Sequence, residues 1–229
     1  MKKALIVVNL AGFLNFLWHD IETLQYMGYK VSVAMNGKLM DDSYAVEIPI
    51  LKEKGIDYFQ IDFDTKSPLA KENVKAYKQL SVVLKNNKYD LVHCHTPIAG
   101  VVTRIAANKY RKQGTKVLYT THGFTFTDRS SKKSWIIYYS VEKIMSRLCD
   151  GIITINHEDF ENAKTMHCKN VYIIPSVGLA NAIDTLTNMD EEKKNFMKEE
   201  CKKMALRFDV SESKEKMMEI YKKILESDK

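Results

Sequence analysis

The sequence predicts an α/β protein: a single Rossmann-like domain with a mainly parallel sheet that helices cover on both faces. Short apolar runs rich in β-branched residues alternate with longer amphipathic stretches over most of the chain. The runs are largely continuous in apolar residues, which is typical of strands covered on both faces. With 229 residues, of which 45% are hydrophobic, the chain can bury a sizeable core.

Seven apolar runs are predicted as strands, and five stretches with helical periodicity lie between them. The predicted strands are Ala4–Leu10, Lys30–Met35, Tyr58–Phe63, Tyr89–His95, Lys116–Thr121, Gly151–Ile155 and Val171–Ile174. The predicted helices are Leu14–Met27, Leu69–Lys85, Ala99–Arg111, Lys132–Leu148 and His157–Met166. In the fourth helix, the apolar residues expected to cover the sheet are Ile137, Val141, Ile144, Met145 and Leu148.

After the seventh strand the alternation stops, and two amphipathic helices follow each other directly. Their apolar stripes are Met197, Cys201, Met204, Ala205 and Phe208, then Met217, Ile220, Tyr221, Ile224 and Leu225. We therefore divide the chain into a Rossmann-like domain, residues 1–178, and a C-terminal helical segment, residues 179–229. Because the last helix must bury its stripe, Met217, Tyr221 and Ile224 are expected to pack on the first domain.

The chain carries a modest excess of positive charge, +6 overall. Residues 1–178 account for it, with 24 Lys and Arg against 17 Asp and Glu, which favours an anionic ligand or surface. Nucleic-acid binding lacks support, because no recognition motif is present and aromatic residues do not interleave with a basic stripe. The four cysteines lie far apart and no cleavage site follows the first apolar run, so we expect reduced thiols and a cytoplasmic location.

The most informative segment follows the fifth strand and reads Thr-Thr-His-Gly-Phe-Thr-Phe over residues 120–126. Residues at the carboxyl end of a parallel strand face the crevice in which such sheets bind ligands. A histidine there, His122, can donate or accept a hydrogen bond, although strand-end histidines are often satisfied by backbone carbonyls. Gly123 leaves room for a ligand, and the rings of Phe124 and Phe126 are expected to pack against a sugar ring or another partly apolar ligand.

The first strand runs into Asn-Leu-Ala-Gly-Phe-Leu-Asn over residues 9–15, where a strand, a glycine and a helix meet. Such a junction can present backbone N–H groups to a phosphate, although a single glycine in a tight turn explains Gly12 equally well. Of the three glycines in the dinucleotide-binding fingerprint only Gly12 is present, which argues against an NAD enzyme.

Two further strand ends carry polar residues. His93 and His95 share a face of the fourth strand and could meet at one metal ion, but further zinc ligands are not evident nearby. We expect one histidine to pack against the covering helices, while His95 and Thr96 reach the mouth of the crevice. After the sixth strand, Asn156 caps the next helix or faces the ligand.

Several of these motifs resemble the N-terminal domain of family-4 glycosyltransferases, which have the two-domain GT-B fold. The resemblance covers about residues 1–178. It is carried by Lys-Val-Leu-Tyr-Thr-Thr-His-Gly-Phe-Thr-Phe (116–126), by Trp-Ile-Ile-Tyr-Tyr-Ser-Val-Glu-Lys-Ile (135–144), by Asp-Gly-Ile-Ile-Thr-Ile-Asn-His-Glu-Asp-Phe (150–160) and by Val-Tyr-Ile-Ile-Pro (171–175). The histidine-glycine-phenylalanine stretch is similar to that of members which build capsular polysaccharide, exopolysaccharide or lipopolysaccharide.

The resemblance implies transfer of a sugar from a nucleotide sugar to a lipid-linked or polysaccharide acceptor, with retention of configuration. It implies no cofactor and no metal bound by an acidic motif. It also implies that His122 orients the transferred sugar and stabilises the developing charge, and that Gly12 lies near the donor phosphates. The other candidate substrate-binding residues are Phe13, Asn15, His95, Thr96, Gly123, Phe124 and Asn156.

One departure from the family pattern follows residues 174–178. Family members continue there into a second Rossmann-like domain that binds the donor, whereas here the chain passes to segments that resemble the family's closing helices. The resemblance thus implies a missing donor domain and weak or absent transfer by this chain alone. The alternative is a non-catalytic module that binds an acceptor or the inner face of the membrane through Lys132, Lys133 and Trp135. Such a module would work with a separate donor-binding chain.

Overall fold

One parallel sheet organises the molecule. The computed structural model describes residues 1–38, 47–64, 70–127, 129–174 and 210–226. In these residues seven strands pair in the order β3-β2-β1-β4-β5-β6-β7, and every neighbouring pair is parallel. The predicted fold class is therefore confirmed.

The strands and helices alternate along the chain, as the apolar pattern requires. The first part comprises β1 (Lys3–Val7), the 3-10 helix η1 (Ala11–Phe16), α1 (Trp18–Tyr26), β2 (Lys30–Met35), α2 (Glu47–Glu53), β3 (Asp57–Gln60) and α3 (Asn73–Asn86). The second part comprises β4 (Leu91–His95), α4 (Pro97–Arg111), β5 (Lys116–Thr120), α5 (Lys132–Met145), η3 (Ser146–Leu148), β6 (Gly151–Thr154), α6 (His157–Lys164), β7 (Val171–Ile173) and α9 (Val210–Glu226).

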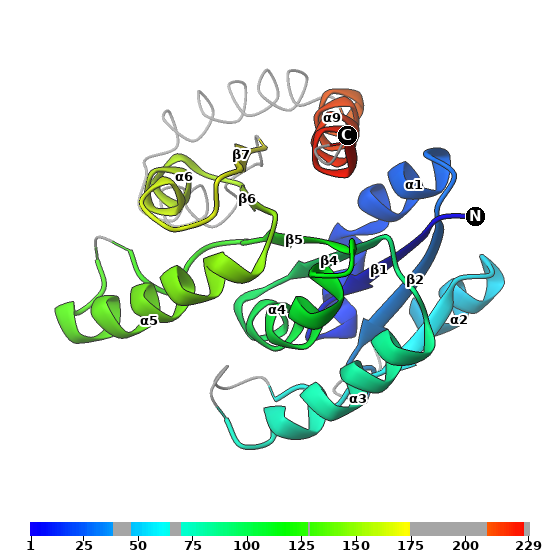
Figure 1. Ribbon diagram of the computed structural model, residues 1–229, viewed down its shortest axis with the longest axis horizontal. Coiled ribbons are helices and arrows are strands. Elements are labelled where there is room, and N and C mark those ends of the chain that lie inside the picture. The colour runs from blue at the N-terminus through cyan, green and yellow to red at the C-terminus, as the bar shows by residue number, and fades with distance from the viewer. Residues whose placement is uncertain (39–46, 65–69, 128, 175–209, 227–229) are drawn as a thin grey trace, which may run out of the picture.

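Two apolar clusters lie on the two faces of the sheet. Successive side chains of β1 alternate between them, because strand side chains have a period of two: Leu5 and Val7 join one cluster, Ala4 and Ile6 the other. Helices α3, α4 and α6 contribute to the first cluster, and α1, α2 and α9 to the second. Figure 1 shows α9 beside α1, with the sheet beneath them.

Helix α9 confirms one expectation from the sequence. Met217, Tyr221 and Ile224 are buried in the second cluster together with Ile220. The earlier apolar stripe, residues 197–208, and the proposed boundary at residue 178 lie outside the described residues. The C-terminal helix therefore closes one face of the sheet.

Helix α5 corrects another expectation. Ile137 and Ile144, which were expected to cover the sheet, are exposed, and the helix turns Glu142 inward instead. The reason is Arg104 in α4, a buried guanidinium that needs an acceptor. Its Nη2 donates to the Glu142 carboxylate at 2.8 Å, and the hydroxyl of Tyr119 donates to the same carboxylate at 3.3 Å.

Two helix predictions near the N-terminus also require correction. The single helix expected from Leu14 to Met27 is split into η1 and α1, which meet at the buried Leu17. Helix α2 was not predicted at all. It is a short helix with Pro49 inside it, and neither feature is a strong helix signal in a sequence.

Candidate functional site

The strand order places the expected ligand-binding edge of the sheet at the carboxyl ends of β1 and β4. The chain proceeds from β1 to β2 and β3 on one side, then returns to β4 on the other side of β1, so the strand order reverses there. Ligands of open α/β sheets bind at such switch points. Asn9 follows β1, and Thr96 follows β4. The Thr96 hydroxyl donates to the side-chain oxygen of Asn9 at 3.0 Å, which joins the two strand ends.

Thr96 has an unusual backbone conformation. Its φ is 68° and its ψ is 151°, a region that non-glycine residues rarely occupy. It is the only non-glycine residue with positive φ in the described parts of the chain. Strained residues of this kind cluster at ligand-binding and active sites, where surrounding contacts hold them in place. The strain marks the start of α4 as part of the candidate site.

His122 follows β5 and lies half-buried at the same edge of the sheet. The edge of its imidazole meets the ring of Phe13, with centroids 4.6 Å apart and planes at 75°. Its Nε2 lies 3.3 Å from Nδ1 of His95. Burial lowers the pKa of His122 to about 4, so the imidazole is neutral at physiological pH. A neutral ring carries one N–H and one bare nitrogen, which suits hydrogen bonding to an uncharged sugar.

His95 is enclosed, which corrects the expectation that it reaches the mouth of the crevice. Its side chain is fully buried, and the centroid of its ring lies 4.1 Å from the centroid of the His93 ring. Burial lowers the pKa of His95 well below the usual value, and burial lowers that of His93 to about 3. His95 therefore contacts a ligand only through His122. Thr96 is also buried, and its side chain is occupied with Asn9.

His93 belongs to a buried chain of polar groups. Its Nε2 lies 2.8 Å from the Thr120 hydroxyl, and its Nδ1 lies 2.8 Å from the hydroxyl of Tyr221 in α9. Tyr221 is in turn hydrogen-bonded to Asp20 in α1. Burial raises the pKa of Asp20 to about 7, although the hydrogen bond with Tyr221 acts to lower this pKa. The neighbouring strand β5 and the covering helix α9 thus meet at one histidine of β4, and α1 joins them through Tyr221.

The same cluster bears on the question of a metal ion. Potential ligand atoms of Asp20, His93 and His95 lie within 4.8 Å of one another, so α1 supplies the third ligand that was not evident from the sequence. Both ring nitrogens of His93 are, however, already engaged with Tyr221 and Thr120. A metal ion would have to displace one of them. The donor set fits a hydrogen-bond network better than a metal centre.

The loop after His122 is held by α6. Gly123 has φ of +124°, which favours glycine. The N–H of Phe124 donates to the Asp159 carboxylate at 3.2 Å. Asn156 accepts the N–H of Asp159 at 2.8 Å and donates to its carboxylate at 2.8 Å, so it caps α6, one of the two roles expected for it.

The aromatic residues of this loop do not face a ligand. Phe124 and Phe126 are buried and stack on each other with centroids 4.7 Å apart. Trp135 and Tyr139 of α5 pack against Phe126 at 5.8 and 5.6 Å. The expectation that the faces of Phe124 and Phe126 meet a sugar is therefore wrong, because these rings complete the core beneath the loop.

The other candidates occupy η1. Gly12 and Phe13 are half-buried, Asn15 is exposed, and α1 begins only at Trp18. Phe13 contacts both Phe16 and His122, so η1 forms the wall of the site opposite the β5 loop. The structure thus brings Phe13 and His122 into contact, with Gly12 beside Phe13 in the chain, while the side chain of Asn156 is engaged with Asp159.

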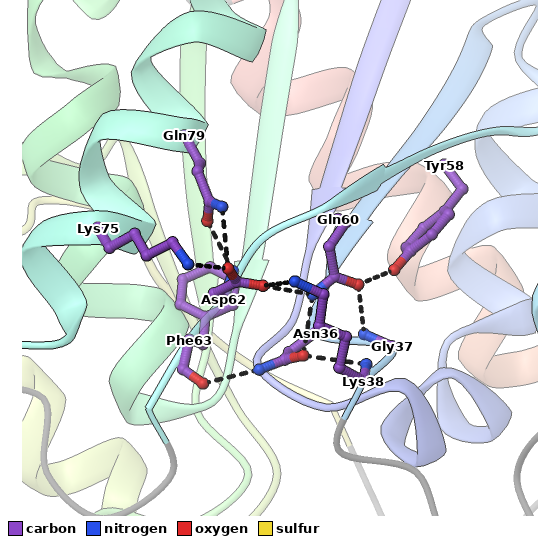
Figure 2. A network of polar contacts seen from close by, with 9 residues as sticks. All are labelled: Asn36, Gly37, Lys38, Tyr58, Gln60, Asp62, Phe63, Lys75 and Gln79. Carbon is purple, nitrogen blue, oxygen red and sulfur yellow. Dashed lines mark hydrogen bonds and ion pairs between the residues drawn. The ribbon is translucent and has the colours of Figure 1, made fainter.

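A second polar network lies at the carboxyl ends of β2 and β3. Figure 2 shows the Asp62 carboxylate with four donors around it: Lys38, Lys75, Gln60 and Gln79. Gln60 also donates to Asn36, whose amide nitrogen donates to the carbonyl oxygen of Phe63 at 2.9 Å. Hydrogen bonds from the two lysines and Gln60 hold the pKa of Asp62 far below its usual value. The network fixes the two strand ends relative to α3.

Sequence reasoning missed several residues of the site. Asn9, Asp20 and Tyr221 come from separate elements, and their contacts depend on how those elements meet in space. Asp159 could have been found, because an asparagine three residues before an aspartate at a helix start is a capping signal.

Comparison with known proteins decides the family. The model of Glycosyltransferase Family 4 matches residues 16–177, more than half of the chain. The chain belongs to glycosyltransferase family 4. This confirms the expected resemblance to enzymes of the GT-B type.

Two curated bacterial proteins are similar to parts of this family-4 chain. EpsD of Bacillus subtilis (strain 168), named as a glycosyltransferase, is 44% identical over 138 residues, which are 60% of this chain and 33% of EpsD. The UDP-Gal:alpha-D-GlcNAc-diphosphoundecaprenol alpha-1,3-galactosyltransferase of Escherichia coli is 31% identical over 105 residues, 45% of this chain and 25% of that enzyme. The chain thus spans a third or less of these relatives.

Solved structures support the fold. UDP-GlcNAc 2-epimerase from Neisseria meningitidis aligns with a TM-score of 0.56 at 14% identity, over 87% of this chain and 54% of that protein. MurG of Acinetobacter baumannii aligns with a TM-score of 0.51 at 16% identity, over 83% of this chain and 50% of MurG. In the part of the family-4 chain that the structure describes, no helix is long and apolar enough to cross a membrane.

Proposed function

We propose that the described sheet domain is the acceptor-side domain of a retaining glycosyltransferase, which moves a sugar from a nucleotide sugar to a lipid-linked or polysaccharide acceptor. The observation that carries the proposal is the position of His122. It lies half-buried beside Phe13, next to the switch point of a family-4 sheet. The proposal places the transferred sugar against His122, which orients it and stabilises charge that develops during transfer.

The other site residues take supporting roles in this proposal. Gly12 lies in η1, where backbone N–H groups can approach the donor phosphates without a side chain in the way. Phe13 packs against the His122 ring and limits its rotation. Asn15 is exposed and free to meet an acceptor. Gly123 lets the loop approach the sugar closely.

The names of the relatives support a choice of substrates to test. The Escherichia coli enzyme is named for a UDP-linked galactose donor and a diphosphoundecaprenol-linked acceptor. We take a uridine-diphosphate sugar and a polyprenyl-diphosphate-linked sugar as the first substrates to test, in the synthesis of cell-surface polysaccharide. Full transfer is expected to need a donor-binding half, and a partner chain is one source of it. Alone, the described domain is expected to transfer slowly or not at all.

A specific observation favours contact with the inner face of the membrane. Helix α5 exposes three isoleucines, Ile136 (60% exposed), Ile137 (45%) and Ile144 (54%). Exposed basic residues lie at both ends of this row: Lys132 and Lys133 at the start, and Arg147 after the end of the helix. An apolar row flanked by Lys and Arg suits an anionic lipid surface. Trp135, expected in this role, instead stacks on Tyr139. A membrane-bound acceptor module without catalysis is the alternative function.

Binding and transfer test the proposal together. Calorimetric titration with UDP-galactose, UDP-N-acetylglucosamine and UDP, and with a short-chain polyprenyl-diphosphate-linked N-acetylglucosamine, measures which ligands the protein holds. Substitution His122→Ala is expected to weaken binding of the preferred ligand about tenfold, because it removes a hydrogen bond in a half-buried site. Radiolabel transfer to the same acceptor measures turnover.

His167→Ala is the matched control. His167 is exposed and precedes the amino end of β7, whereas His122 follows the carboxyl end of β5, so the loss of His167 is expected to leave binding unchanged. Equal affinity in wild type and His122→Ala would reject the proposed site. Binding of acceptor with no transfer, even when a donor-binding chain is added, would favour the non-catalytic module.

A further inference from the structure

Two histidine pairs meet behind the candidate site and form a continuous path into the protein. His122 pairs with His95, and the His95 ring packs against His93. His93 is held from both sides, by Thr120 of β5 and Tyr221 of α9. Only His122, at one end of the path, reaches the surface of the site. The orientation of the rings at the buried end can therefore decide which nitrogen of His122 carries the proton, and so whether His122 donates or accepts a hydrogen bond toward a ligand.

The direction of the hydrogen bonds at the buried end can be worked out. Above its pKa of about 7 the Asp20 carboxylate is mainly ionised and can only accept, so the Tyr221 hydroxyl donates to it. The Tyr221 oxygen then accepts from Nδ1 of His93, which places the proton of His93 on Nδ1. Nε2 of His93 is bare and accepts from the Thr120 hydroxyl. With Asp20 ionised, Asp20, Tyr221, His93 and Thr120 are all satisfied in this arrangement, whereas a protonated Asp20 would reverse it.

The proton between His95 and His122 follows from the remaining nitrogen of His95. Its Nε2 is buried and has no hydrogen-bond partner among the described residues. An unpartnered buried N–H is rarer in proteins than an unpartnered acceptor. The proton of His95 therefore belongs on Nδ1, which donates to Nε2 of His122 at 3.3 Å. A neutral His122 then carries its own proton on Nδ1.

We propose that His95, held in place by His93 and Tyr221, is a positioning residue that fixes His122 as an N–H donor at Nδ1. No hydrogen bond to this Nδ1 is recorded in the described residues, so it is available to an oxygen atom of the ligand. The ligand chemistry this selects is a hydroxyl or phosphate oxygen that accepts. The inference rests on the proposed function for the identity of that ligand, but the position of the proton is a property of the free protein.

Tyr221 has the most distant contribution. It lies 128 residues from His93 in the sequence and is fully buried under α9. Its hydroxyl keeps the His93 ring from turning over. The His93 ring in turn restricts His95, whose rotation would replace Nδ1 by a carbon opposite His122. Docking of the C-terminal helix is thereby linked to the state of the site.

Nitrogen-15 spectra of the histidine side chains test the proposal directly. Protonated and bare ring nitrogens have distinct chemical shifts, so the tautomer of each imidazole can be measured in the full chain without ligand. At pH 7.5 we expect His122 to carry its proton on Nδ1. A proton on Nε2 of His122 would overturn the proposal, whether or not any nucleotide sugar binds.

Substitutions separate positioning from folding. Tyr221→Phe is expected to mix the tautomers of His93 and His122 and to weaken binding of UDP-galactose about threefold to tenfold. Tyr29→Phe is the matched control, because Tyr29 is buried in the same cluster and its hydroxyl has no partner among the described residues. Unchanged tautomers in Tyr221→Phe would remove Tyr221 from the proposal.

A second pair of variants keeps the test independent of α9. His95→Ala removes the N–H donor to His122. His95→Asn restores a donor, because the amide nitrogen of Asn is attached to Cγ, as Nδ1 of His is. We expect mixed His122 tautomers in His95→Ala and recovery in His95→Asn. Equal spectra for these two variants would contradict the positioning role. If the tautomers behave as expected but neither a nucleotide sugar nor the polyprenyl-diphosphate-linked acceptor binds, the proposed function fails and the proton assignment stands.

Discussion

At the scale of single residues, buried polar groups decide how the strand ends are arranged. Asp62 is the clearest example away from the histidines, because its side chain is only 16% exposed and accepts from two lysines and two glutamines. The donors come from the end of β2, from β3 and from α3. One carboxylate therefore ties three segments together (Figure 2).

Asp62→Asn tests the strength of this network. We expect the free energy of unfolding at pH 7 to fall by about 1–2 kcal/mol, because hydrogen bonds to a charged acceptor are lost while the lysines remain largely solvated. The neighbouring Asp57 makes a single exposed ion pair with Lys30, so Asp57→Asn is a matched control with an expected loss below about 0.5 kcal/mol. Urea unfolding measures both.

The same pair of variants has a predicted pH dependence. The folded-state pKa of Asp62 is depressed, so its contribution is present above the ordinary aspartate pKa of about 4 and is lost as pH falls further. The difference in stability between wild type and Asp62→Asn should therefore shrink below about pH 4. A difference that stayed constant from pH 7 to pH 3 would show that the charge of Asp62 is not the cause.

At the scale of elements, the sequence was sufficient for the strands and less so for the helices. All seven predicted strands exist, because continuous β-branched runs leave few alternatives. Helix α2 escaped prediction because it is short and contains Pro49. The inward face of α5 was predicted wrongly because its sequence offers two stripes at helical spacing, one with Ile137 and Ile144 and one with Glu142. A partner for Arg104 selects the stripe that contains Glu142, and this contact spans 38 residues.

The outward stripe of α5 leads to a prediction about membranes. Replacing Ile136 and Ile137 together by Gln is expected to reduce co-sedimentation with vesicles that contain phosphatidylglycerol at least fivefold, because the apolar part of the contact is lost. Neutral phosphatidylcholine vesicles should bind weakly from the start, and salt should release the protein from anionic ones.

Val82→Gln serves as the control for this experiment. Val82 is an exposed apolar residue of α3, so it tests whether any loss of surface hydrophobicity has the same effect. If the wild-type protein does not bind anionic vesicles, the membrane contact is removed from the proposed function. The same holds if the α5 and α3 variants reduce binding equally.

At the scale of the whole molecule, the candidate site depends on contacts between the two ends of the chain. The strand-end motif around His122 was visible in the sequence, because a histidine and a glycine after a buried strand are a local signal. The support behind it was not, because Asp20, His93 and Tyr221 lie in three elements that meet only in the folded protein. Stability of the C-terminal helix and order in the site should therefore change together.

Ile224 is the residue that tests this dependence most cleanly. It is buried over Gly151 of β6, where an added Cβ would lie 3.1 Å from the Ile224 side chain, so the absence of a side chain on the strand admits the helix. Ile224→Ala should lower the free energy of unfolding by about 2–5 kcal/mol, since it leaves a cavity between helix and sheet. Lys222→Ala, on the exposed side of the same helix, should change it by less than about 0.5 kcal/mol.

The effect of Ile224→Ala should extend from stability to the site. If α9 is held mainly by its apolar contacts, Ile224→Ala should also increase hydrogen exchange in α1 and β4, the elements that share Tyr221 with it, while β2 and β3 remain protected. Loss of stability with an even increase in exchange across the sheet would show that α9 stabilises the domain without ordering the site. Exchange confined to α1, β4 and α9 would place the C-terminal helix and the histidine cluster in one cooperative unit.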